Sequence, residues 1–88
     1  MSNASGVAIV SGAARGLGRA FADRLNAEGY TVLPFDVNPS IEDQANGVIA
    51  DVSQRSDVER VIKAASVVGP IKVVVNNAAT CQRYLRQL

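Results

Sequence analysis

The sequence predicts an α/β fold in which helices cover both faces of a doubly wound parallel sheet, giving three layers. Two observations predict it. Short apolar, β-branched runs alternate along the chain with segments of helical spacing, the pattern of parallel strands joined by crossover helices. A glycine-rich turn also joins the first of these strands directly to the first helix. We expect about four strands in the order 3-2-1-4, which is an incomplete sheet of this class.

The first strand and the first helix are predicted on either side of the glycine-rich turn. Val7 to Ser11 is an apolar, β-branched run that stops at Gly12. The helix that follows is expected to end at Gly29, because glycine is favoured just after the last helical residue. Its apolar face is expected from residues spaced i, i+3, i+4 and i+8, namely Leu17, Ala20, Phe21 and Leu25.

The second and third strands are predicted at Thr31 to Asp36 and at Val48 to Val52. Pro34 is unusual inside a strand because it has no N–H for the hydrogen-bond ladder, so we expect it at a bulge or near the strand's end. Residues 37–46 contain several turn-forming residues and predict a loop with at most a short helical turn.

The second helix carries signals at both ends. Ser56 and Glu59 have the spacing of a capping box, and the Gly69-Pro70 pair is typical of a helix stop. Its apolar face is expected from four residues of helical spacing, Val58, Val61, Ile62 and Ala65.

The fourth strand is predicted at Ile71 to Val75. Its nearly all-apolar composition is typical of a parallel strand that is buried on both faces. In the order 3-2-1-4 this strand is also an edge of the sheet, and an apolar edge pairs readily with another chain. We therefore expect self-association through it. Residues 80–88 have partial helical spacing over too short a length to predict a helix.

Length and composition exclude several classes of function. The chain has 88 residues, nine Lys plus Arg against eight Asp plus Glu, one Cys and no His. We expect a single small domain of marginal stability, with no basic surface for nucleic acid, no internal disulfide and no Cys/His metal site. No apolar run is long enough to span a membrane, and we expect a cytoplasmic protein.

The glycine-rich turn from Gly12 to Gly18 is the strongest chemical signal. Between a strand and a helix, backbone N–H groups and the helix dipole form a site for a phosphate, and glycines permit the tight turn and close approach that a pyrophosphate needs. The spacing is Gly-x-x-x-Gly-x-Gly, with Gly16 as the middle glycine and Arg15 before it. The alternative is a turn that uses glycine only for its dihedral angles.

Asp36 ends the second strand 18 residues after Gly18, close to the spacing of about 20 for a carboxylate that binds the adenosine ribose. Its charge would repel a 2′-phosphate and favours NAD over NADP. Arg15 is the contrary signal, because a guanidinium in this loop could pair with that phosphate. The alternatives are a turn-forming Asp36 and a solvated Arg15.

Two further motifs complete a family pattern. The pair Asp51-Val52 follows the third strand, and Asn76-Asn77-Ala78-Ala79 follows the fourth. Together with the three-residue gap in the glycine turn, they resemble the short-chain dehydrogenase/reductase family over residues 6–80. Taken singly, Asp51 could cap the next helix and the two asparagines could form a turn.

The resemblance implies a partial Rossmann-like domain and the front, cofactor-binding part of an NAD(P)-dependent oxidoreductase that transfers hydride between a nicotinamide and an alcohol or carbonyl. It implies that the backbone of the glycine turn holds the pyrophosphate and that Asp36 holds the adenosine ribose. The remaining roles fall to Asp51 and Val52 for adenine and to Asn77 for the ribose on the nicotinamide side. The turn residues concerned are Gly12, Arg15, Gly16, Leu17 and Gly18.

No catalytic residue is assigned. The family that this sequence resembles uses a catalytic Ser, a Tyr and a Lys four residues after the Tyr. In this chain, Leu88 stands four residues after Tyr84. We expect Tyr84 to be a packing or interface residue, and the 88-residue chain alone to be inactive. A second interpretation is a complete, non-catalytic module that binds a nucleotide or pairs with another subunit.

Overall fold

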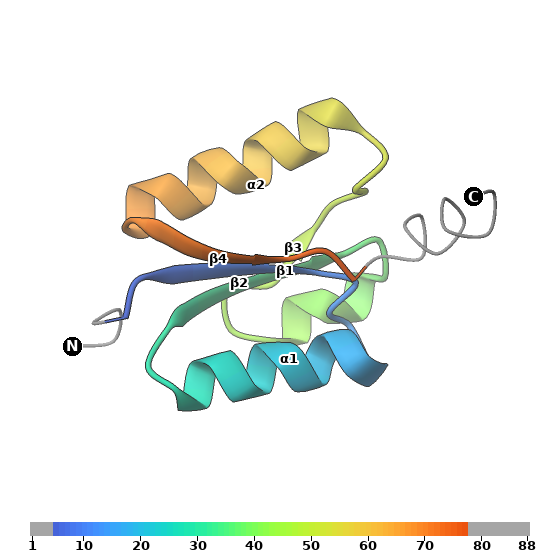
Figure 1. Ribbon diagram of the computed structural model, residues 1–88. Helices are drawn as coiled ribbons and strands as arrows, with labels where there is room; N and C mark the ends of the chain where they lie inside the picture. The colour runs from blue at the N-terminus through green and yellow to red at the C-terminus, as the bar shows by residue number, and fades with distance from the viewer. Residues whose placement is uncertain (1–4, 78–88) are drawn as a thin grey trace, which may run out of the picture.

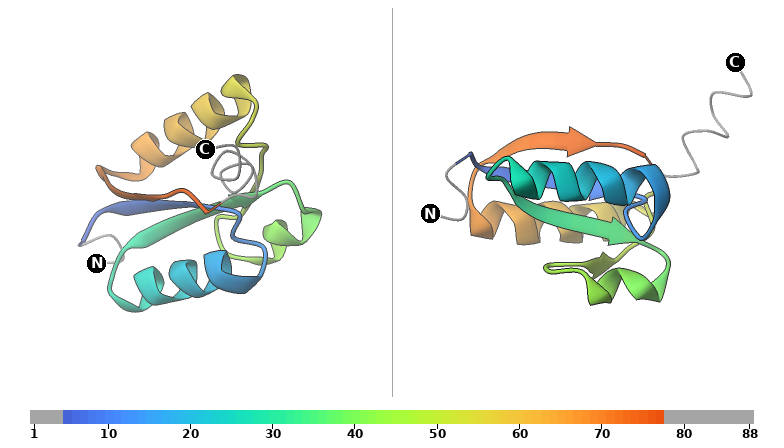
Figure 2. Two further views of the ribbon diagram at one scale, coloured as in Figure 1. Left: turned by 45° about the vertical axis from the view of Figure 1, so that its right-hand side comes forward. Right: turned by 90° about the horizontal axis from the view of Figure 1, so that it is seen from below.

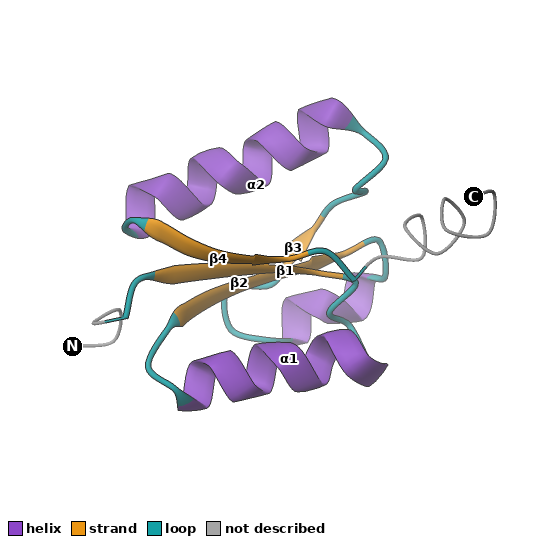
Figure 3. Cartoon of the chain, viewed as in Figure 1, coloured by secondary structure: helices purple, strands orange, loops and turns teal. Residues whose placement is uncertain are grey.

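The computed structural model describes residues 5–77 as one parallel sheet between two helices (Figures 1 and 3). The sheet has the order β3-β2-β1-β4, and all its strands are parallel. Helix α1 covers one face, and helix α2 covers the other (Figure 1). The elements are β1 (Val7–Ser11), α1 (Gly16–Ala27), β2 (Thr31–Asp36), the 3-10 helix η1 (Pro39–Asp43), β3 (Val48–Ile49), α2 (Arg55–Val68) and β4 (Ile71–Val75).

These observations confirm the predicted fold class and strand order. The bounds of β1, β2 and β4 agree with the sequence patterns, and η1 is the short helical turn expected between the second and third strands. The predicted tail at residues 80–88 lies outside the described residues, as does Tyr84. Two different views show that η1 lies beside β3, on the α1 side of the sheet (Figure 2).

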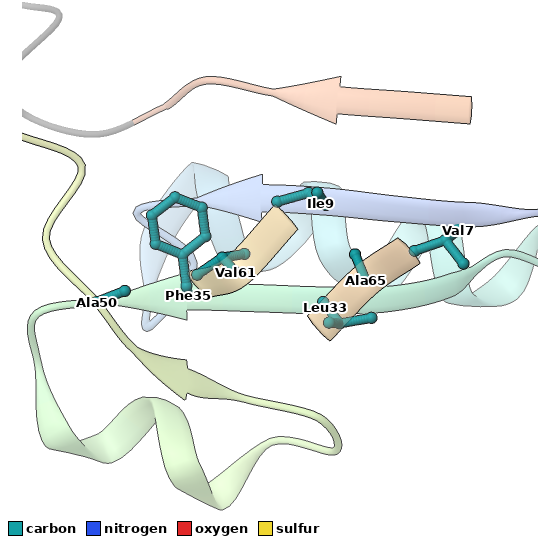
Figure 4. Packing of buried hydrophobic residues seen from close by; sticks show 7 residues of the cluster. All are labelled: Val7, Ile9, Leu33, Phe35, Ala50, Val61 and Ala65. Carbon is teal, nitrogen blue, oxygen red and sulfur yellow. The ribbon is translucent and has the colours of Figure 1, made fainter. Parts of the chain in front are cut away.

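Each face of the sheet has its own apolar core, because successive side chains of a strand point to opposite faces. On the α2 face, side chains from β1, β2 and α2 point toward one another (Figure 4), and the cluster consists of Val7, Ile9, Leu33, Phe35, Ala50, Val61 and Ala65. On the α1 face, the cluster consists of Ala8, Val10, Ala13, Ala14, Ala22, Val32 and Ile41. The α1 face is therefore filled mostly by small residues.

The predicted apolar face of α1 is wrong at three of its four residues, and only Leu25 packs against the α1-side core. Leu17 is 63% exposed and Phe21 is 39% exposed, and Ala20 is exposed as well. The buried positions are Gly18 and Ala22. A Cβ at position 18 would overlap the carbonyl oxygen of Gly12, so the helix lies too close to the loop to bury large side chains there. Because α1 lies so close to the glycine turn, the small residues form its inner face.

Both helices end at the predicted glycines. The N–H of Gly29 donates to Asn26 (3.1 Å) and that of Tyr30 to Leu25 (3.1 Å), with Gly29 in the left-handed region at φ +98°. This is a Schellman motif, which a residue with a Cβ adopts only at a cost. Helix α2 ends at Gly69, whose N–H donates to Ala65 (3.2 Å).

Pro34 lies inside β2 without a bulge, so that part of the prediction is wrong. It pairs with Val10 in an unbroken register between β1 and β2. Backbone groups of a parallel strand face its two neighbours alternately. The N–H of Thr31 donates to Gly6 on the β1 side, whereas the carbonyl of Asp36 accepts from Ala50 on the β3 side. By this alternation the nitrogen of Pro34 faces β3.

Strand β3 does not reach Pro34, and this is why the proline is tolerated. Its two residues pair only with Phe35 and Asp36. One step before Pro34 on the same side, the carbonyl of Val32 accepts from the side-chain amide of Asn46 (3.4 Å) instead of from a strand. The missing N–H of Pro34 therefore leaves no ladder bond unmade.

The predicted third strand, Val48 to Val52, is too long, and the predicted capping box of α2 is wrong. Pairing stops after Ile49, because the chain turns at Asp51. Gln54 is the residue before α2, so Ser56 lies within its first turn rather than at its cap. The carboxylate of Asp57 accepts from the N–H of Asp51 (2.9 Å), which ties the start of α2 to this turn.

Strand β4 is half-exposed rather than buried on both faces. Its residues alternate between half-buried and exposed, and Val74 is 68% exposed. On α2, Ile62 was predicted to be buried and is 47% exposed. The reason is the same for both: β4 pairs only with β1, so no further part of residues 5–77 covers this side of the sheet.

Candidate functional site

The predicted site residues converge at the carboxyl ends of the strands. The turn from Gly12 to Gly18 follows β1, Asp36 ends β2, Asp51 follows β3, and Asn77 follows β4. The chain runs from β1 outward to β3 and then returns to the other side of β1, so the order reverses between β1 and β4. In open parallel sheets ligands bind at such a switch point.

The glycines of the turn have different structural roles. Gly12 (φ +64°) and Gly16 (φ +63°) occupy the left-handed region, which disfavours residues with a Cβ. Nothing lies within 4 Å of the place where a Cβ of Gly16 would stand, so the space beside it is open. At Gly18, a Cβ would lie 2.7 Å from the side-chain nitrogen of Asn77. The turn therefore combines an open cradle with a close helix–strand contact.

The backbone N–H groups at the start of α1 have no capping side chain within residues 5–77. Arg15 precedes the helix in extended conformation, and within residues 5–77 no side chain caps it and no acidic residue lies in its first turn. Arg15, Gly16 and Leu17 are exposed. Uncapped N–H groups and the helix dipole favour a negative ligand at this end.

Asp36 is held by two backbone groups. Its Oδ2 accepts from the N–H of Ala14 (2.9 Å) in the glycine turn, and its Oδ1 accepts from the N–H of Asn38 (3.0 Å). The second bond is the one that a turn-forming aspartate makes to the N–H two residues later. Both oxygens keep a further lone pair, because a carboxylate oxygen accepts two hydrogen bonds. The carboxylate is therefore fixed beside the turn with acceptor capacity left.

Asp51 and Val52 lie at the turn after β3. The Oδ1 of Asp51 accepts from both the N–H (2.9 Å) and the hydroxyl (2.7 Å) of Ser53. These bonds favour the ionised form and hold the pKa of Asp51 below its ordinary value of 3.8, the hydroxyl contributing most. Asp51 does not cap α2, since Gln54 occupies that position. Val52 is half-buried against the α2-side core.

We expect Ser53→Ala to raise the pKa of Asp51 toward its ordinary value, because the larger of the two stabilising bonds is removed. An NMR titration of the Asp51 carboxyl carbon measures this change. The folded-state pKa is lowered, so the contribution of Asp51 to stability is present above the ordinary value and is lost as the pH falls below it. Ser66→Ala, on the exposed surface of α2, is the matched control and should leave the Asp51 titration unchanged.

Ser11 is a site residue that the sequence patterns missed. Its side chain is buried at the end of β1, where the Oγ accepts from the N–H of Asn77 (2.8 Å). The same hydroxyl shares its proton between the carbonyl of Val75 (3.3 Å) and the Oδ1 of Asn76 (3.2 Å). It thus ties β4 to β1 at the switch point and places Asn77 beside Gly18. The available signal was a polar residue ending an otherwise apolar strand.

The short chain dehydrogenase family model matches residues 6–87. The chain belongs to this family. A relative, 4-formylbenzenesulfonate dehydrogenase from Comamonas testosteroni, is 38% identical over an alignment of 89 positions. The alignment covers 88% of this chain and 35% of that enzyme. Galactitol 2-dehydrogenase from Agrobacterium fabrum is 37% identical, and the match covers 83% of this chain and 32% of that enzyme.

A solved structure supports the same assignment. The crystal structure of 3-hydroxyacyl-CoA dehydrogenase type-2 from Mycobacterium avium matches with a TM-score of 0.73 at 32% identity, covering 83% of this chain and 32% of that one. The chain therefore spans about a third of the length of these relatives.

Neither helix between residues 5 and 77 is long and apolar enough to cross a membrane. The same residues contain no group of three or more Asp, Glu, Cys or His side chains placed to hold a metal ion.

Proposed function

We propose that this chain is the NAD-binding front part of a short-chain dehydrogenase/reductase-type oxidoreductase. The observation that supports it most is the open space beside Gly16, at an uncapped helix start, next to the fixed carboxylate of Asp36. When bound, the nicotinamide supplies or accepts the hydride exchanged with an alcohol or carbonyl substrate. In this proposal, the residues described here bind and orient the cofactor.

The proposed contacts follow the geometry of the strand ends. The backbone of the turn from Gly12 to Gly18 holds the pyrophosphate, with the N–H groups that follow Ala14 as donors and with Arg15 and Leu17 exposed on the same loop. Asp36 accepts from the adenosine ribose hydroxyls with its remaining lone pairs. Asp51 and Val52 border the adenine, and Asn77 borders the ribose on the nicotinamide side. Ser11 orients Asn77 through its main chain.

Thermal unfolding of the purified chain, alone and with saturating NAD or NADP, tests the proposal. A ligand at about 100 times its dissociation constant adds about 2.7 kcal/mol to the free energy of unfolding. We expect a clear upward shift of the midpoint with NAD and a smaller one with NADP. A cooperative transition that neither nucleotide moves would contradict the proposed function.

We expect Asp36→Asn to raise the affinity for NADP relative to NAD by about tenfold, since one repulsive charge near a 2′-phosphate is removed. The amide oxygen still accepts from the N–H of Ala14, so the loop keeps its support. Titration calorimetry with both nucleotides measures the ratio. Asp43→Asn makes the same charge change on an exposed residue of η1 and should leave the ratio unchanged. Equal ratios in the two variants would refute Asp36 as the selector.

The second candidate function is a subunit-pairing module, which the open edge of β4 favours. Val74 is exposed there, beside an apolar hollow of about 160 Å³ that it lines together with Val58 and Ile62 of α2. We propose that β4 of a second copy pairs with this edge. Sedimentation velocity at micromolar concentration is expected to show a dimer.

Val74→Lys is expected to shift this dimer toward monomer, because it places a charge on the apolar edge. Val67→Lys is the matched control, since Val67 is exposed on α2 and does not line the hollow beside Val74. A chain that sediments only as a monomer before any substitution would rule out the pairing.

A further inference from the structure

We propose that Gln44 is a positioning residue for the glycine turn, acting with Asp36 as a clamp on one peptide group. The carbonyl of Ala13 accepts from the Nε2 of Gln44 (2.8 Å), and the N–H of Ala14 donates to the Oδ2 of Asp36 (2.9 Å). These two backbone groups belong to the same peptide plane. The inference rests on the proposed function, in that the turn it concerns is the one proposed to bind the dinucleotide.

The clamp matters because it fixes the orientation of this plane, which turns about the backbone bonds of Ala13 and Ala14. The N–H of Ala13, which belongs to the preceding plane, is held separately by the carbonyl of Phe35 (3.2 Å). A rotation of the peptide plane moves its carbonyl and its N–H in opposite directions, so it breaks both bonds of the clamp at once. Asp36 alone would hold only the N–H, and Gln44 supplies the second point.

The backbone that carries Gln44 is itself fixed. Its N–H donates to the carbonyl of Ile41 (3.0 Å), and its own carbonyl accepts from Gly47 (3.0 Å). Ile41 is fully buried in the α1-side core. A Cβ at Gly47 would overlap the carbonyl oxygen of Ile41, so this turn is packed against the end of η1. The side chain of Gln44 therefore reaches the loop from a rigid base.

The clamp also sets the electrostatics of the turn. A backbone carbonyl carries partial negative charge, and one facing an anion repels it. Gln44 holds the carbonyl of Ala13 toward η1 instead. The N–H of Ala14 is occupied by Asp36, which leaves the N–H groups that follow it, at the uncapped start of α1, as donors for a phosphate.

The test compares Gln44→Glu with the unsubstituted chain. Glutamate keeps the size of the side chain but removes the donor and turns an oxygen toward the carbonyl of Ala13. The first measurement needs no ligand: hydrogen exchange of the Ala14 amide, with the Val10 amide of β1 reporting on global stability. We expect exchange at Ala14 to accelerate about tenfold and that at Val10 to stay nearly constant. The second measurement is NAD affinity by calorimetry, expected to fall about tenfold.

Gln54→Glu is the matched control, the same chemical change at an exposed glutamine before α2, and should alter neither quantity. Equal acceleration at Ala14 and Val10, or none at Ala14, would overturn the clamp. An unchanged NAD affinity despite faster exchange at Ala14 would overturn its role in positioning. If Gln44→Glu accelerates exchange at Ala14 as expected but the unsubstituted chain binds no NAD, the proposed function is refuted and the clamp still stands.

Discussion

Gly18→Ala is expected to lower the free energy of unfolding by about 3 kcal/mol or more, which a small domain of marginal stability cannot absorb. The added Cβ would overlap the carbonyl oxygen of Gly12 and lie 2.7 Å from the side-chain nitrogen of Asn77. The first of these neighbours is backbone, so it cannot rotate away. Circular dichroism during thermal unfolding should show a greatly lowered midpoint or no cooperative transition.

Gly16→Ala is the matched control for this prediction. Its Cβ would meet nothing within 4 Å, and the cost is restricted to the left-handed backbone, about 1 to 2 kcal/mol. We therefore expect Gly16→Ala to fold and Gly18→Ala not to. If Gly18→Ala lost no more stability than Gly16→Ala, the close approach of Gly18 to Gly12 would not be the constraint at this position.

Ile41→Ala is expected to lower the free energy of unfolding by about 2 to 5 kcal/mol, the range for truncating a large buried aliphatic side chain. Ile41 is fully buried and is the only large side chain that η1 contributes to the α1-side core among the described residues. Its loss leaves a cavity under η1. Chemical denaturation, analysed for both midpoint and slope, measures the change.

The same substitution at Ile62 provides the comparison. Ile62 is about half exposed on α2, so Ile62→Ala removes little buried area, and we expect a loss of about 1 kcal/mol or less. A loss at Ile62 as large as that at Ile41 would mean that a partner covers the β4 side of the sheet in solution.

The sequence patterns predicted the strands of this fold well and the helix faces poorly. Apolar β-branched runs gave the bounds of β1, β2 and β4. For β1 and β2 the reason is that inner strands of a parallel sheet are buried on both faces, whereas β4 is a half-exposed edge whose run is equally apolar. For α1 the rule that large apolar residues face the core failed. Contact with the glycine turn requires the small residues Gly18 and Ala22 on the inner face, and periodicity gives no account of distance.

The candidate site was predictable where one residue type has one evident role. The glycines and Asp36 could be identified from spacing after a strand. Ser11 and Gln44 could not, because their bonds join segments 66 and 31 residues apart along the chain. A serine or a glutamine has many uses, so only the fold shows that both of them hold backbone groups of the site. The capping box failed for a related reason, since Asp57 binds a residue of the preceding turn.

The position of Pro34 makes the two sides of the sheet unequal. On the β3 side, pairing is limited to two residues, and a longer third strand would meet a nitrogen that cannot donate. On the other side, β4 offers five residues of strand, and its outer edge pairs with no other strand of residues 5–77. The longer edge available to a further strand, from the same chain or from a neighbouring copy, is therefore that of β4, because Pro34 limits how much of the third strand can pair with β2.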